Sequence, residues 1–129
     1  MLIGELAKRT GTTAKTLRFY EDEGLLPEPT RTSGGYRDYP AESADRVEFI
    51  RGAQQAGLTL RQIGEVLDIR DGGRPPCEHV GRLIDQRLVD VEQRIVGLEQ
   101  IRSRLRELAR RTAELDPADC SGYCDIIET

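Results

Sequence analysis

The sequence predicts a mainly α-helical protein, with several short helices and a small hairpin followed by one long helix. Residues 1–70 contain short segments with apolar residues three and four positions apart, separated by Gly, Pro and polar turn residues. Residues 77–113 contain no Pro, and Gly occurs there only at positions 81 and 97. We therefore expect one globular segment over 1–70, a linker at 71–76 (Asp-Gly-Gly-Arg-Pro-Pro), a long helix over 77–113, and a separate C-terminal loop and tail over 114–129.

The first two helices are expected at residues 3–9 and from about residue 13 to residue 20. Ile3, Leu6 and Ala7 share one face of the first, and Gly11 stops it. Thr12 or Thr13 offers a hydroxyl cap for the second helix, which ends near Gly24. Two short helices joined by a brief turn that contains Gly form a helix-turn-helix pattern.

Three prolines (Pro27, Pro29 and Pro40) and the pair Gly34-Gly35 exclude a helix from the next segment. Two short polar and aromatic runs flank Ser-Gly-Gly at 33–35, which indicates a β-hairpin. A third helix is expected over 43–56. A fourth begins at Thr59, where Gln62 three residues later completes a capping box.

The long helix carries an apolar stripe with the alternating three- and four-residue steps of a coiled coil. Its members are Leu88, Val91, Ile95, Leu98 and Leu105, and Arg102 interrupts the series. A single helix cannot cover such a stripe, and the chain has no second stripe of that length. The simplest partner is another copy of the chain, so we expect a homodimer.

Composition limits the functional classes. The chain has 129 residues, a formal net charge of −4 and no Trp, and a third of its residues are charged. It contains no run near the roughly 20 apolar residues of a membrane span and no signal peptide pattern, and its three cysteines fit a reducing compartment. We therefore expect a cytoplasmic protein without a membrane partner. The net charge by itself argues against nucleic-acid binding through bulk positive charge.

Local charge placement points the other way. Residues 1–40 hold six basic and six acidic side chains, and Lys15 and Arg18 lie three positions apart on the second helix. Such a helix can donate to phosphates and reach base edges of double-stranded DNA, although a merely solvated charged face explains the same spacing. The candidate DNA-contacting residues are Thr13, Lys15, Thr16, Arg18 and Tyr20 on the helix, and Arg31, Tyr36, Arg37 and Tyr39 on the hairpin.

Several motifs in order resemble the MerR family of transcription regulators. They are IGELA (3–7), TLRFYE (16–21), GLLP (24–27), Arg31, GYRDY (35–39), FIR (49–51) and GLTL (57–60). The resemblance implies a winged helix-turn-helix dimer joined by an antiparallel coiled coil. Such dimers bind promoter DNA whose −35 and −10 elements are too far apart, then distort it on sensing a signal so that RNA polymerase engages both. It also implies that Lys15, Arg18 and Tyr20 contact DNA from the recognition helix, and Arg31, Tyr36 and Arg37 from the wing.

The three cysteines lie at opposite ends of the long helix. Cys77 begins it, whereas Cys120 and Cys124 follow its other end, roughly 50 Å away along a straight helix. They cannot share a metal within one subunit, but in an antiparallel dimer Cys77 of the partner subunit would meet Cys120 and Cys124. Three thiolates select soft ions such as Zn(II), Cd(II), Pb(II), Hg(II) or Cu(I). Each cysteine alone could equally be a small buried or idle surface residue.

Nearby groups extend this candidate site. His79 could be a fourth ligand, but we favour a surface residue in the first turn of the long helix, and Asp116 and Asp119 are weaker oxygen candidates. The resemblance implies that a cysteine at position 77 marks a sensor of divalent ions, since copper(I) sensors have Ser there. Cys120 and Cys124 lie closer together than the loop pair usual in the family, which leaves the preferred ion among Zn, Cd, Pb and Hg open.

Two alternatives use the same scaffold. In one, Cys120 and Cys124 form a thiol-disulfide redox switch that controls a DNA-binding regulator. In the other, the chain is a zinc-clipped coiled-coil adaptor without a role on DNA. We do not expect an enzyme, because the chain has one histidine, no evident carboxylate pair and no Gly-rich phosphate loop.

Overall fold

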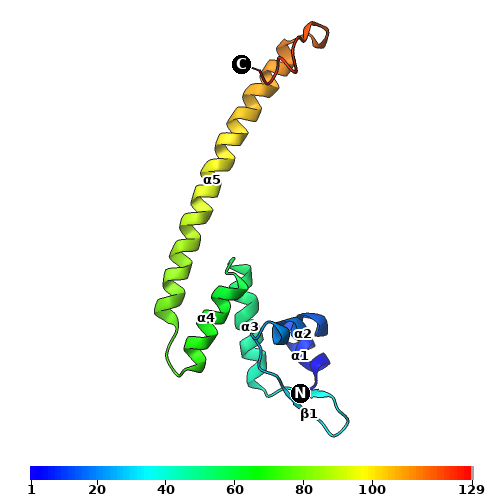
Figure 1. Ribbon diagram of the computed structural model, residues 1–129, viewed down its shortest axis with the longest axis vertical. Helices are drawn as coiled ribbons and strands as arrows, with labels where there is room; N and C mark the ends of the chain where they lie inside the picture. Colours follow the sequence, from blue (N-terminus) through cyan, green and yellow to red (C-terminus); the bar gives the residue numbers. More distant parts are fainter. Residues whose placement is uncertain (129) are drawn as a thin grey trace. The chain divides into compact units, whose positions relative to one another are not determined.

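The computed structural model describes residues 1–128 and is mainly helical (Figure 1). Its elements in chain order are α1 (Ile3–Thr10), α2 (Ala14–Asp22), β1 (Thr30–Arg31), β2 (Arg37–Asp38), α3 (Glu42–Gln55), α4 (Leu60–Asp71), α5 (Cys77–Glu114) and the 3₁₀ turn η1 (Pro117–Asp119). These elements confirm the expected helix-turn-helix, hairpin and long helix. The chain forms two compact units, Met1–Arg87 and a second that begins at Leu88.

The turn between α1 and α2 is formed by local backbone chemistry. Gly11 ends α1 with a φ of 67°, a left-handed conformation that glycine adopts without strain. The hydroxyl oxygen of Thr13 then accepts a hydrogen bond from the backbone N–H of Thr16 (3.1 Å) and caps α2. Arg51 of α3 donates to the carbonyl of Thr10 and so ties this turn to α3.

The core of the first unit lies where α1, α2, α3 and α4 meet. Leu6, Leu17, Val47, Ile50 and Ile63 are fully buried there. Each such side chain stabilises the fold by about 1.5–3 kcal/mol relative to exposure in water. The faces that bury these residues determine which faces of α2 remain at the surface.

The hairpin is short and is joined at its open end to the segment before α1. β1 and β2 are antiparallel, with Thr30 opposite Asp38 and Arg31 opposite Arg37. Leu2 forms an isolated bridge to Asp38, so the segment before α1 extends this small sheet. Two pairs of residues make a marginal sheet, and its position therefore depends on contacts with the helices.

The capping box predicted at the start of α4 is confirmed. Thr59 accepts from the N–H of Gln62, and the Gln62 side chain accepts from the N–H of Thr59. The preceding Gly57 has a φ of 87°, and a Cβ on it would lie 2.5 Å from the guanidinium of Arg87. Val80 and Leu83 pack against the core, so the first turns of α5 belong to the first unit.

The second unit consists of the rest of α5 and a folded C-terminal segment. The predicted stripe from Leu88 to Leu105 is solvent-exposed in the single chain, with exposed fractions between 37% at Val91 and 66% at Leu98. After η1 the chain turns back, and Arg111 donates to the carbonyls of Asp125 and Glu128. Among residues 1–128, none of the helices combines the length and apolarity that a membrane span requires.

Candidate nucleic-acid interface and cysteine loop

The structure brings basic residues of α2 and the hairpin to one groove. Arg18, Arg31, Tyr36 and Arg37 line it together with the segment Leu2–Glu5. Lys15 is exposed on α2, three positions from Arg18 and on the same side of the helix. Helix and hairpin thus present cations side by side, as a surface that grips a nucleic-acid backbone requires.

The two threonines proposed as DNA contacts have local partners. The Thr13 oxygen caps α2, and the Thr13 hydroxyl lies 3.0 Å from the Thr16 hydroxyl. In this structure, these two threonines therefore stabilise the N-terminus of α2. Tyr36 is 68% exposed on the hairpin, and Arg31 donates to the carbonyl of Gly35 (3.0 Å) while its side chain remains at the surface.

The structure buries Tyr20, which the sequence predicts as a DNA contact. Tyr20 is 2% exposed, and its hydroxyl donates to Oε1 of Gln54 on α3 (2.7 Å). The helix period explains the placement, because position 20 follows Leu17 by three residues and shares its buried face. Burial raises the pKa of Tyr20, so the phenol stays protonated and remains a donor.

Glu21 joins α2 to the hairpin through contacts that the sequence did not predict. Its carboxylate accepts from Nε of Arg37 (3.1 Å) and from the hydroxyl of Tyr39. Tyr39 is 2% exposed, so it belongs to the core and not to the hairpin surface. Burial and the bond to Glu21 raise the pKa of Tyr39 well above its ordinary value. No spacing within α2 indicates these contacts, because both partners lie on another element.

The three cysteines form no disulfide within residues 1–128 of one chain, and they differ in exposure. Cys77 and Cys120 are exposed, and Cys124 is half-buried. Cys77 is the first residue of α5, whereas the other two follow η1. Within residues 1–128 of one chain, no three His, Cys, Asp or Glu side chains converge as a metal site would require.

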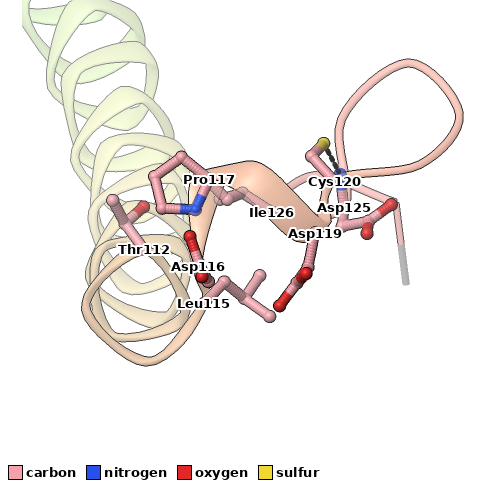
Figure 2. Close-up of a pocket in the computed structure, with 8 residues that line it drawn as sticks. All are labelled: Thr112, Leu115, Asp116, Pro117, Asp119, Cys120, Asp125 and Ile126. Atoms are coloured by element: carbon pink, nitrogen blue, oxygen red, sulfur yellow. Dashed lines mark hydrogen bonds between the residues drawn. The ribbon is translucent and has the colours of Figure 1, made fainter.

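The loop after η1 holds its sulfur atoms in a defined backbone. Figure 2 shows Cys120 beside Asp125, whose backbone N–H donates to the Cys120 sulfur (3.3 Å). Cys120 lies at the edge of a cavity of about 250 Å³. The other lining residues are Thr112, Leu115, Asp116, Pro117, Asp119, Asp125 and Ile126.

Three carboxylates near the loop cysteines already accept backbone hydrogen bonds. Asp116 accepts from the N–H of Ala118 (2.9 Å) and Asp125 from that of Ser121 (3.1 Å). Glu128 accepts from the N–H groups of Tyr123 and Cys124. These acids therefore shape the loop, and the thiols remain as its soft donors. Such a donor set fits a soft ion better than a hard one.

His79 faces α4. Its Nε2 lies 3.4 Å from Oε2 of Glu65 without the geometry of a hydrogen bond, and its Nδ1 lies 3.5 Å from the Arg82 guanidinium. His79 is thus half-buried against α4, and not on the open surface of the first turn of α5 where the sequence predicts it. A role as fourth ligand stays a prediction.

A helix-turn-helix beside a short hairpin, followed by a long helix with an uncovered apolar stripe, defines a winged helix-turn-helix DNA-binding regulator. Comparison with known families agrees. The family described as "MerR HTH family regulatory protein" matches residues 1–69, and "MerR, DNA binding" matches residues 44–108. The chain therefore belongs to the MerR family.

Individual relatives narrow the class. The chain is 38% identical over 127 residues to the "HTH-type transcriptional regulator ZntR" of Escherichia coli K12, covering 98% of this chain and 89% of that one. It is 37% identical to the "Mercuric resistance operon regulatory protein" of Bacillus cereus, covering 98% and 94%.

Among solved structures, the chain is similar to the transcription regulator PbrR691 of Ralstonia metallidurans CH34 in complex with lead(II). The TM-score is 0.79 at 36% identity, covering 98% of this chain and 95% of that one. These likenesses place the chain in the metal-sensing branch of the family, whose members regulate transcription from promoter DNA as dimers. Its relatives are transcription regulators and not enzymes.

Proposed function

We propose that this chain binds a soft divalent metal ion through Cys120, Cys124 and Cys77 of the partner subunit, and in response activates a promoter by distorting its DNA. The supporting observation is the position of accessible thiols at both ends of one long helix. An antiparallel pairing of two such helices brings the start of one beside the end of the other. Two equivalent sites per dimer would result.

We assign the DNA contacts to side chains of α2 and the hairpin that are exposed. Lys15 and Arg18 of α2 are exposed and free to reach base edges or phosphates in the major groove. Arg31 and Tyr36 are exposed on the hairpin, in position for the sugar-phosphate backbone. Through the distorted promoter, the dimer would act on RNA polymerase.

The proposed metal is one of a class of soft divalent ions. The donor set consists of thiols, which select Zn(II), Cd(II), Pb(II) or Hg(II) over hard ions such as Mg(II). The relatives named for mercuric resistance and crystallised with lead(II) support this group. Three sulfurs favour the ions that are satisfied by three-coordinate thiolate binding, and we therefore rank Pb(II) and Hg(II) ahead of Zn(II).

The test combines metal stoichiometry with transcription. Native mass spectrometry of the reduced dimer should show two bound ions, and Cys77→Ser should abolish them while leaving a dimer. Ser121→Ala, a change beside Cys120 that removes no thiol, is the matched control and should retain both ions. A transcription assay across Zn(II), Cd(II), Pb(II), Hg(II) and Cu(I) then identifies the inducer.

The redox alternative makes a different forecast. If Cys120 and Cys124 form a disulfide switch, an oxidant alone should alter transcription, and Cys77→Ser should respond like the wild type. That result would replace the metal proposal. Membership of the MerR family is incompatible with the other alternative, an adaptor that does not bind DNA.

A further inference from the structure

Two hairpin side chains converge on one carboxylate of α2. Glu21 is mostly buried, and its two oxygens accept separately from Arg37 (Oε2, 3.1 Å) and from Tyr39 (Oε1). Arg37 is the first residue of β2, and Tyr39 is the first residue after that strand. The last turn of α2 thus contacts the hairpin at two positions on the same side, Arg37 within β2 and Tyr39 just after it.

This attachment matters because the hairpin cannot position itself. Its strands are two residues each, and such a ribbon is marginal on its own. The side chains that point to solvent, Arg31 and Tyr36, lie before and at the end of the turn, away from the core. Their position relative to α2 therefore depends on how firmly β2 is held.

Engagement with Glu21 also changes the role of Arg37. Its Nε is used by the carboxylate, and its side chain is 28% exposed. Of the two wing arginines, Arg31 is the exposed one, and Arg37 is part of the attachment.

We propose that Glu21 is a positioning residue for DNA binding, whose carboxylate holds the hairpin at the distance from α2 at which Arg31 and Tyr36 engage the backbone while Lys15 and Arg18 engage the groove. This inference rests on the DNA-contacting surface assigned under the proposed function. It gives an acidic residue a favourable role at a surface that binds a polyanion.

The direction in which one substitution changes DNA affinity distinguishes a positioning role of Glu21 from a simple effect of its charge. By charge alone, neutralising an acid beside the phosphates strengthens binding, because it removes a repulsion. By positioning, the same change weakens binding, because the neutral amide has one acceptor oxygen in place of two and loses the charge-assisted bond to Arg37. Glu21→Gln keeps the size of the side chain. Weaker DNA binding by this variant therefore indicates positioning, and stronger binding indicates charge alone.

Asp22 supplies the matched control. It is the next residue of α2, is exposed, and carries the same charge without contacting the hairpin. Asp22→Asn therefore reports the effect of lost negative charge near DNA. Tyr39→Phe is a second variant that removes only one of the two donors and keeps the buried ring.

The experiment uses the full-length dimer and a duplex selected by the wild-type protein from a random-sequence library. Binding is measured by fluorescence anisotropy over a series of salt concentrations. We expect Glu21→Gln to weaken binding about tenfold or more. We also expect a shallower dependence of log K on log salt, by about one contact per subunit, because each lost phosphate contact removes ~0.9 from the slope. Asp22→Asn should bind as tightly as the wild type or slightly tighter, and Tyr39→Phe should lose a smaller factor than Glu21→Gln.

Hydroxyl-radical footprinting provides a readout that general destabilisation does not produce. Glu21→Gln should lose protection of the backbone contacted by the hairpin and keep protection around the groove contacted by α2. Binding by Glu21→Gln equal to or tighter than that of Asp22→Asn would overturn the inference, as would a uniform loss of protection. If Glu21→Gln does not fold, Tyr39→Phe decides by the same two criteria. A wild-type protein that selects no duplex would instead refute the proposed function.

Discussion

Replacing Leu98 by Glu tests the dimer interface at its most exposed apolar position. Leu98 is 66% exposed in the single chain, in the middle of the stripe on α5. Full burial of a leucine side chain contributes about 2 kcal/mol, so covering the exposed two-thirds contributes ~1.3 kcal/mol. A symmetric dimer contains the position twice, which brings the loss to ~2.6 kcal/mol before any cost of burying two carboxylates. The dissociation constant of the dimer should therefore rise by about a hundredfold or more.

Analytical ultracentrifugation over a range of protein concentrations measures this change directly. Gln100→Glu is the matched control, because it adds the same charge two residues away, on the opposite side of α5. The control should dimerise like the wild type at the same ionic strength. A Leu98→Glu protein with the wild-type dissociation constant would refute the assignment of this stripe to the interface.

Three further predictions concern the first unit. Arg18→Ala should weaken specific DNA binding by about 1–3 kcal/mol without changing the dimer, and unchanged affinity in an anisotropy titration would contradict its place in the DNA surface. Tyr20→Phe should lower the free energy of unfolding by about 1 kcal/mol through loss of its bond to Gln54, with DNA affinity unaltered; reduced affinity at full stability would restore Tyr20 as a DNA contact. The Arg46 guanidinium holds the pKa of Asp71 below its ordinary value, so this pair stabilises the fold at neutral pH and the contribution is lost as pH falls through the lowered pKa. Asp71→Asn should therefore narrow the difference in urea stability between pH 7 and acid, and an unchanged difference would show that the pair contributes nothing.

The DNA-binding surface shows where reasoning from periodicity reaches its limit. Lys15 and Arg18 were identified from their spacing, and the structure leaves both exposed on α2. Tyr20 has the chemistry of a DNA contact, yet it shares the face of Leu17 and is buried. The contacts of Glu21 could not be predicted from the pattern of its helix, because its partners lie on a different element, 16 and 18 residues further along the chain.

The cysteine loop has a similar limit. The identity and order of the three cysteines are evident from the sequence, and they suggest a site shared between subunits. Of the two oxygen candidates, Asp116 and Asp119, the structure shows Asp116 accepting from a backbone N–H group of the loop. Asp125 and Glu128, which the sequence did not single out, accept from backbone N–H groups as well, a use that residue type alone does not reveal.

The sequence by itself determined the helical elements, the hairpin, the turn at Gly11, the cap at Thr59 and the need for a second α5. These features depend on interactions between residues close in the chain, or on an apolar stripe too long for one helix to cover. Only the tertiary structure decided which side chains of α2 remain available to DNA and which hold the hairpin. Those roles depend on the face that α2 buries against α3 and on where β2 meets its last turn. Spacing within a single helix carries no information about such contacts between separate elements.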